Sequence, residues 1–389
     1  MTDSRGPTSR VRSRAAAHGA LTAVSVAAAL LGAEAVVRIF DLGPEISPVF
    51  RENYRLSENT ALRYELIPGS PDGENRINSD GMRDHEHPVA KPPGVFRIVC
   101  LGDSITYGFG VPTRSSYPAR LEDRLNSKAG PGVRFEVLNF GVTGYNITQS
   151  IENLRARGLK YRPDLVIYQY CLNDPQQYSS ELENLEISLT AAEAGYRRRL
   201  LSRGGRLLSG SRVFALAAFA WQSATPGGRR ARAARPDSQW LAIRGGSYAD
   251  YFSRLHADPI GWRRIETGFA ELAALGNEFG FEGLVVLFPV LANLADYPLA
   301  DVHERVIGAA RAASLPQLDL LPVYQKAAGR GQSIAVNALH PNAMGHAFAA
   351  GSIIDALEAQ GTLRRTPPSE TLPKTRDEKG EIPRPNPQR

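Results

Sequence analysis

The chain has 389 residues, 42% of them apolar, and a formal net charge of +6. This length allows one large domain or two ordinary ones, and the apolar fraction supports a substantial core. The charge is uneven, because much of it lies in two short basic stretches, 5–14 and 197–235. Such a distribution argues against a nucleic-acid-binding protein, so no nucleic-acid partner is expected.

Residues 1–18 are basic, and residues 19–40 are mostly apolar or small, with Glu34 and Arg38 as interruptions. A membrane-spanning helix needs about 20 mostly apolar residues, which 19–40 reaches only by including Glu34. We predict a signal anchor, with a cleaved signal peptide (A-x-A at 33–35) and an ordinary soluble helix as alternatives. In the first two cases the rest of the chain is exported, and stays membrane-anchored or is secreted.

Residues 41–94 are rich in Pro, Gly and charge, and we interpret them as a lead-in segment with little core of its own. Within 95–360, apolar runs alternate with amphipathic stretches, which predicts a parallel sheet with helices on both faces. The expected elements are strand 96–101, helix 116–127, strand 134–140, helix 146–159, strand 163–170, helix 261–280, strand 281–289, helix 301–314, strand 316–321 and helix 342–360, with Asn342 as the N-cap of the last.

An insertion at 175–260 interrupts this alternation. It is either a solvated helical lid with an arginine face, or a patch that faces a membrane or an acidic substrate through the apolar stretch 213–221. Residues 361–389 are rich in Pro and charge, and we expect a disordered tail.

The two cysteines, Cys100 and Cys171, each end an apolar run, and neither has the spacing of a metal-ligand pair. Both are expected to be small buried core residues, and a disulfide between them is left open. No phosphate-binding or dinucleotide-binding glycine pattern occurs, so we expect no cofactor and no metal site.

Four polar features follow predicted strands, at the edge of the sheet where open α/β folds bind ligands. They are Gly102-Asp103-Ser104, the stretch 141–146, Asn173-Asp174 and His340-Pro341-Asn342. Nucleophilic acyl chemistry requires a hydroxyl, a base and hydrogen-bond donors for the developing oxyanion. Taken singly, each residue is as well explained by a turn or a helix cap, but the four together favour chemistry.

These blocks, GDSITYG at 102–108, LNFGVTGYN at 138–146, ND at 173–174 and LHPN at 339–342, resemble those of the SGNH/GDSL hydrolase family. The resemblance covers residues 95–360. It implies a flavodoxin-like three-layer αβα sandwich of class α/β, with five parallel strands in the order 2-1-3-4-5, after an N-terminal transmembrane or signal helix.

The resemblance also implies residue roles. Ser104 is similar to the nucleophile and His340 to the general base. The Ser104 N–H, the Gly144 N–H and the Asn173 side chain would form the oxyanion hole, with Gly144 matching better than Gly141. The expected substrate is an ester, either an O-acylated carbohydrate or a lipid ester, and the outcome is hydrolysis or acyl transfer. Protein partners are unknown.

One departure concerns the position three residues before the histidine, where the family usually has an aspartate and this chain has Asn337. Replacing that carboxylate by an amide can lower kcat by about four orders of magnitude in a serine protease. Three explanations remain open. In the first, Asn337 or a backbone carbonyl orients His340. In the second, another aspartate, such as Asp296 or Asp319, reaches His340 in space; in the third, the site is weak or non-catalytic. The last option corresponds to a second hypothesis, an envelope binding or scaffold protein that keeps the fold without turnover.

Four other polar residues near these blocks are expected to be structural. Asp103 and Asp174 are predicted to accept hydrogen bonds from loop backbone, and His346 to make an ordinary polar contact. Arg83 is assigned a turn contact, with a place at the mouth of the site as the alternative.

Overall fold

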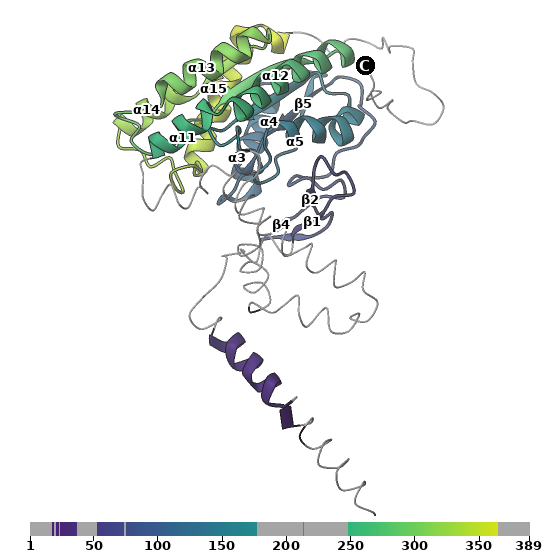
Figure 1. Ribbon diagram of the computed structural model, residues 1–389. Coiled ribbons are helices and arrows are strands. Elements are labelled where there is room, and N and C mark those ends of the chain that lie inside the picture. The colour runs from purple at the N-terminus through teal and green to yellow at the C-terminus, as the bar shows by residue number, and fades with distance from the viewer. Residues whose placement is uncertain are drawn as a thin grey trace, which may run out of the picture.

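A five-stranded parallel sheet forms the centre of the molecule (Figure 1). The computed structural model describes residues 18, 21–22, 24–36, 53–73, 75–176, 213 and 248–364. The strand order is β6-β5-β7-β8-β9, which is 2-1-3-4-5 when these five strands are numbered along the chain, as predicted. The strands are β5 (Val95–Leu101), β6 (Arg134–Asn139), β7 (Leu165–Tyr170), β8 (Glu282–Leu287) and β9 (Gln317–Asp319).

Helices cover both faces of the sheet, because successive side chains of a buried strand point to opposite faces. In β5, Val99 and Leu101 belong to one apolar cluster, and Ile98 and Cys100 to the other. The first cluster is closed by α5 (Ile147–Asn153), α11 (Tyr248–Ala257), α12 (Pro259–Phe279) and α13 (Ala300–Ala312). The second is closed by α4 (Tyr117–Lys128), α14 (Leu321–Gly329) and α15 (Ala343–Ala359).

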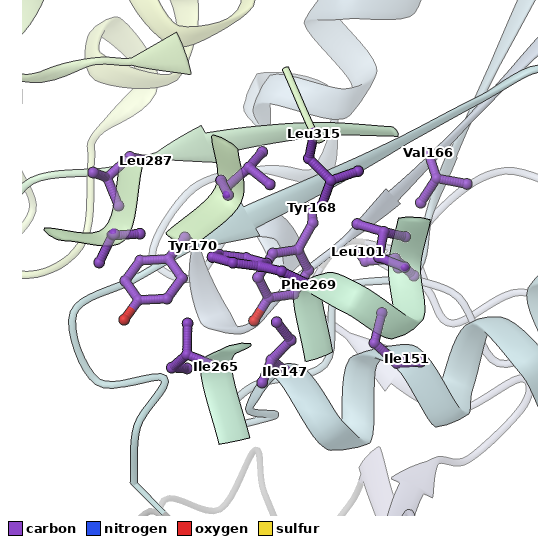
Figure 2. Packing of buried hydrophobic residues seen from close by; sticks show 14 of the residues in the cluster. Leu101, Ile147, Ile151, Val166, Tyr168, Tyr170, Ile265, Phe269, Leu287 and Leu315 are labelled. Atoms are coloured by element: carbon purple, nitrogen blue, oxygen red, sulfur yellow. The ribbon is translucent and has the colours of Figure 1, made fainter. Parts of the chain in front are cut away.

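Figure 2 shows the first cluster around Phe269 of α12, which lies against Tyr168 and Tyr170 of β7. The ring of Phe269 is 6.2 Å from that of Tyr168 and 6.1 Å from that of Tyr170, centroid to centroid, and all three are buried. Truncating a buried phenylalanine to alanine typically costs about 3–5 kcal/mol. This packing therefore holds the carboxyl end of β7, where Asn173 follows.

Most predicted elements occur near the predicted bounds. The helix predicted at 146–159 is regular only to Asn153, and continues as a π-helical turn, η2 (Leu154–Gly158), and a 3-10 turn, η3 (Leu159–Tyr161). The Asn342 side chain caps α15, as predicted, by accepting from the N–H groups of Met344 at 2.9 Å and Gly345 at 3.1 Å. Short 3-10 turns, η1 (Thr113–Ser115) and η4 (Thr362–Arg364), precede α4 and follow α15.

The segment before β5 has more core than we expected. Two antiparallel pairs form there, β1 (Tyr54–Leu56) with β2 (Tyr64–Leu66), and β3 (Pro71–Asp72) with β4 (Asn75–Arg76). Their apolar side chains bury each other and three residues of the sheet domain, in a cluster of Tyr54, Leu62, Tyr64, Leu66, Ile77, Tyr107, Val142 and Tyr145. The prediction of little core is therefore wrong for this segment.

Several predictions lie wholly or partly outside the described residues. These are the basic tail before His18, most of the insertion with residues 214–221, and the tail from 365 onward. Residues 24–36 are helical, but in the described parts of the chain no helix has both the length and the apolarity to cross a membrane. Cys100 and Cys171 are buried, as predicted, and are free thiols rather than a disulfide.

Candidate active site

Ser104 is the first residue of a short helix, α3 (Ser104–Tyr107), directly after β5. The Asp103 side chain caps this helix by accepting from the Ile105 N–H at 2.9 Å. N–H groups in the first turn of a helix have no acceptor within the helix, which leaves the Ser104 N–H outside its hydrogen-bond ladder. The predicted structural role of Asp103 is confirmed, and the nucleophile candidate stands at the carboxyl edge of the sheet.

Gln169 of β7 holds this turn, and sequence reasoning missed it. Its Oε1 accepts from the Asp103 N–H at 3.1 Å, the Thr106 N–H at 3.3 Å and the Thr106 hydroxyl at 2.9 Å. A Cβ at Gly102 would lie 2.3 Å from that same oxygen, so only glycine fits there. A polar glutamine near the end of an otherwise apolar strand, as in LVIYQY, is the sequence feature that could have identified it.

His340 meets Ser104 across a gap of 236 residues in the chain. The Ser104 Oγ and the His340 Nε2 are 2.8 Å apart. The loop that carries the histidine is held by a bridge between Ala335 and Pro341 and by a 2.8 Å bond from the Val336 N–H to the His340 carbonyl. The structure thus brings the predicted nucleophile and base within hydrogen-bond reach.

Asn337 fixes the tautomer of His340. Its Oδ1 accepts from the backbone N–H groups of Leu339 at 3.0 Å and His340 at 2.9 Å, which identifies this atom as the amide oxygen. The same oxygen lies 2.9 Å from the His340 Nδ1, and an oxygen can only accept there. Nδ1 therefore carries the proton, and Nε2 presents its lone pair to the Ser104 hydroxyl.

The two aspartates considered as substitutes do not take this place. Asp319 accepts from the Nδ1 of a different histidine, His303, at 3.0 Å, and the Nε2 of His303 is 2.9 Å from the Tyr297 hydroxyl. Asp296 is exposed. Of the three explanations for the missing carboxylate, the geometry matches the one in which Asn337 orients His340.

Burial lowers the pKa of His340 to about 4. The ring of Phe109 lies against the imidazole, with centroids 4.7 Å apart, and shields it from water although Phe109 itself is partly exposed. A desolvated imidazole without a carboxylate partner resists protonation. His340 is consequently neutral at pH 7, which is the form that can accept a proton.

The loop between β6 and α5 lies beside this turn, joined by a 3.2 Å bond from the Val142 N–H to the Gly102 carbonyl. Gly144 has φ +76°, a left-handed conformation that favours glycine. Gly141 instead packs against α3, since a Cβ there would be 2.3 Å from the Tyr107 nitrogen. Glycine is thus needed at the two positions for different reasons: close packing at Gly141, and a left-handed backbone at Gly144.

Asn173 lies in the turn that follows β7, where its backbone carbonyl accepts from the Gln176 N–H at 2.9 Å. Burial raises the pKa of Asp103. Asp174 accepts from the Cys171 N–H at 2.9 Å and from the Tyr168 hydroxyl at 2.7 Å, as a structural residue. His346 is buried and its Nδ1 accepts from the Tyr117 N–H at 3.2 Å, as an ordinary polar contact.

Arg83 clamps the backbone that follows Ser104. Its buried guanidinium donates to the carbonyls of Tyr107 at 3.0 Å, Gly108 at 3.1 Å and Val111 at 2.9 Å. Its Nε donates to Asp72 at 2.5 Å, and Asp72 also accepts from the Tyr107 hydroxyl at 2.8 Å. The predicted turn contact is confirmed, and it is made to the last residue of α3 and to the turn that follows.

A model of the GDSL-like lipase/acylhydrolase family matches residues 100–348, a span that includes both Ser104 and His340. The chain belongs to this family. No curated protein sequence matches the chain.

Three solved structures similar to this GDSL-family chain are each no more than 17% identical to it. A two-domain esterase (CEX) active on acetylated mannans is 17% identical with a TM-score of 0.41, and the match covers 72% of this chain and 53% of that one. The acetyl xylan esterase AlAXEase is 15% identical (TM-score 0.38; 67% and 100% covered). The psychrotrophic esterase EstA from Pseudoalteromonas sp. is 11% identical (TM-score 0.37; 68% and 98% covered). The chain thus spans about half the length of the mannan esterase.

Proposed function

We propose that this protein is a serine esterase that cleaves an O-acyl ester through an acyl-Ser104 intermediate. The observation that carries the proposal is the chain of two hydrogen bonds from the Ser104 Oγ to the His340 Nε2 and from the Nδ1 to Asn337. A neutral base, a defined tautomer and a hydroxyl in reach are the requirements for activating a serine.

In the acylation step, the Ser104 Oγ attacks the ester carbonyl carbon while its proton passes to the His340 Nε2. The oxyanion is held by the N–H groups of Ser104 and Gly144 and by the Asn173 amide. The C–O bond to the alcohol then breaks, and the alcohol leaves with the proton from Nε2. In deacylation, water attacks the acyl carbon and gives a proton to the His340 Nε2. The bond between the acyl carbon and the Ser104 Oγ then breaks, the Oγ takes the proton from Nε2, and the acid is released.

The proposal is tested with p-nitrophenyl acetate and a fluorophosphonate probe, on the wild type and on Ser104→Ala. We expect turnover and covalent labelling of the wild type only. Ser115→Ala is a matched control outside the site and should behave as the wild type. If neither the wild type nor Ser104→Ala hydrolyses the ester, and the probe labels neither, the enzyme proposal is wrong.

Asn337 favours a second candidate, a non-catalytic envelope protein that binds acylated carbohydrate. An amide orients His340 but supplies no charge to stabilise the imidazolium that forms during catalysis. A transferase is the other outcome at the same site, when a sugar hydroxyl replaces water in deacylation. A panel of lipid esters and acetylated carbohydrates, including acetylated mannan and xylan, distinguishes these functions. An esterase releases free acid, a transferase yields an acylated acceptor, and a binding protein produces neither.

We further propose that the catalytic domain is exported, and stays tethered through residues 19–40 or is secreted after cleavage. The basic residues of 1–18 followed by the apolar stretch support this orientation. An alkaline phosphatase fused after residue 45 should be active in a bacterial host, and an inactive fusion would contradict export. The N-terminal sequence of the mature protein distinguishes a tether from a cleaved signal.

A further inference from the structure

The outer edge of the sheet is covered by side chains rather than by another strand. β6 is the terminal strand of the sheet, so its outward N–H groups have no neighbouring strand and can pair with another chain unless other acceptors bind them. Three side chains accept from them: Asn126 from Phe135 at 2.9 Å, Glu122 from Val137 at 2.7 Å and Asp84 from Asn139 at 2.9 Å. Two carboxylates are therefore fixed along this edge, each by a backbone N–H of β6.

Two histidines converge on one of these carboxylates. The Nδ1 of His85 lies 3.0 Å from Oδ1 of Asp84, and the Nε2 of His87 lies 3.1 Å from Oδ2. One ligand atom from each of the three residues can be chosen so that all lie within 4.8 Å of one another. The imidazole rings are 4.1 Å apart, centroid to centroid, and tilted by 43°.

We propose that Asp84, His85 and His87 bind a divalent transition-metal ion, with Zn²⁺ as the ion that suits these ligands best. Imidazole nitrogens and a carboxylate oxygen are ordinary zinc ligands, and three protein ligands leave a fourth position for water. No metal site was expected from the sequence, because neither the cysteine spacing nor a known metal-binding motif indicated one. The spacing Asp-His-x-His at 84–87 is the sequence feature that corresponds to this cluster.

The three side chains stand close to the spacing that a tetrahedral ion requires. Zinc bonds of 2.0–2.2 Å place neighbouring ligand atoms roughly 3.3–3.5 Å apart. Each histidine lies 3.0 or 3.1 Å from a different oxygen of Asp84, and one ligand atom from each residue lies within 4.8 Å of the other two, so binding of one ion requires side-chain rotations of about an ångström. The Asn139 N–H already orients Asp84, as the partners of metal ligands commonly do. The His85 side chain is 53% exposed, which gives the ion a route from solvent.

Hydrogen bonding alone leaves this cluster incomplete. The His87 side chain is fully buried, and its Nδ1 has no hydrogen-bond partner among the described residues. Glu122 completes the surroundings, with its Oε1 3.5 Å from the His85 Nε2.

The position of the cluster indicates what an ion would do. Asp84 directly follows Arg83, the residue that clamps α3, and the ion would pin this segment against β6 and α4. Among the described residues, none of the three ligands forms a hydrogen bond to Ser104, His340 or Asn337, so we assign the ion a role in stabilising the lead-in segment. Variants of the cluster are therefore expected to change metal binding and thermal stability rather than the chemistry.

The test uses the full chain without a polyhistidine tag, stripped with a chelator, and titrated with Zn²⁺ by calorimetry and with Co²⁺ by visible absorption. We expect tight binding, d–d bands of tetrahedral Co²⁺, and a Zn²⁺-dependent rise in Tm. His85→Asn removes an exposed ligand and should weaken binding at least tenfold and abolish the rise. His18→Asn, an exposed histidine elsewhere, is the matched control and should keep both.

His87→Gln and Asp84→Asn extend the series, and near-ultraviolet circular dichroism checks that each variant is folded. If a buried substitution prevents folding, His85→Asn still decides the question, since this side chain is on the surface. The proposal is overturned if the wild type shows neither Co²⁺ bands nor a Zn²⁺-dependent rise in Tm. It is equally overturned if His85→Asn binds as the wild type does, because the ion then lies elsewhere.

Discussion

Replacing Asn337 by aspartate restores the carboxylate that the family usually has three residues before the histidine. Aspartate has nearly the same shape, and its oxygen can accept the same three hydrogen bonds, from Leu339 N–H, His340 N–H and the His340 Nδ1. The only new term is a negative charge beside the imidazolium that forms when Ser104 gives up its proton. The variant thus isolates what the charge contributes.

The size of the effect follows from distance and exposure. A carboxylate about 4 Å from the imidazolium charge is worth ~4 kcal/mol at an effective dielectric constant of 20, and ~1 kcal/mol in water. Position 337 is exposed, so screening brings the value to about 1–2 kcal/mol. Because 1.36 kcal/mol corresponds to a tenfold change in rate, kcat should rise about 5- to 30-fold in Asn337→Asp.

The pH profile gives an independent readout. His340 acts as a base in its neutral form, so activity is lost as the pH falls through its pKa, which is about 4 in the wild type. A neighbouring carboxylate favours the protonated form and raises that pKa. The acid limb of kcat/KM should therefore move to higher pH in Asn337→Asp.

Stopped assays with p-nitrophenyl acetate from pH 3.5 to 8 measure both effects. Asn293→Asp is the control, because it adds the same charge at an exposed asparagine whose side chain makes no hydrogen bond or ion pair in the described structure. An Asn337→Asp protein that is folded but shows an unchanged acid limb would refute the placement of Asn337 against the His340 ring. A fall in kcat with a shifted limb would show that the amide itself is needed.

Three further substitutions test the surroundings of the site and the stability of the sheet. Arg83→Lys keeps the positive charge but cannot reach three carbonyls at once, so kcat should fall about 10- to 100-fold at unchanged KM; a normal kcat in the folded variant would refute the clamp. Phe109→Ala exposes His340 to water and should raise its pKa, which the acid limb of kcat/KM reports; an unmoved limb would show that the ring does not shield the base. Arg97→Met breaks a fully buried ion pair with Glu136, 2.8 Å long, and should lower the free energy of unfolding in urea by about 3–5 kcal/mol; a change below 1 kcal/mol would mean that the pair contributes little.

The sequence determined the sheet and the place of the site. Buried parallel strands are continuous apolar runs, which the sequence shows directly, whereas the strand order was implied by the resemblance to the family. The carboxyl ends of such strands share one edge, so Ser104 and His340 could be assigned to the same site from sequence position. The N-cap at Asn342 was equally local, since a cap depends on the next few residues only.

Only the tertiary structure decided which contacts each of these residues makes. The amide at Asn337 has the right orientation because two backbone N–H groups pin its oxygen, which no residue pattern states. The clamp by Arg83 joins a segment whose own composition predicts little core to the turn of Ser104. Gln169 and Phe109 likewise contact residues that are far from them in the sequence, Asp103 and His340 respectively. Long-range contacts depend on how elements pack in three dimensions, whereas sequence patterns report mainly the local periodicity and the order of the elements.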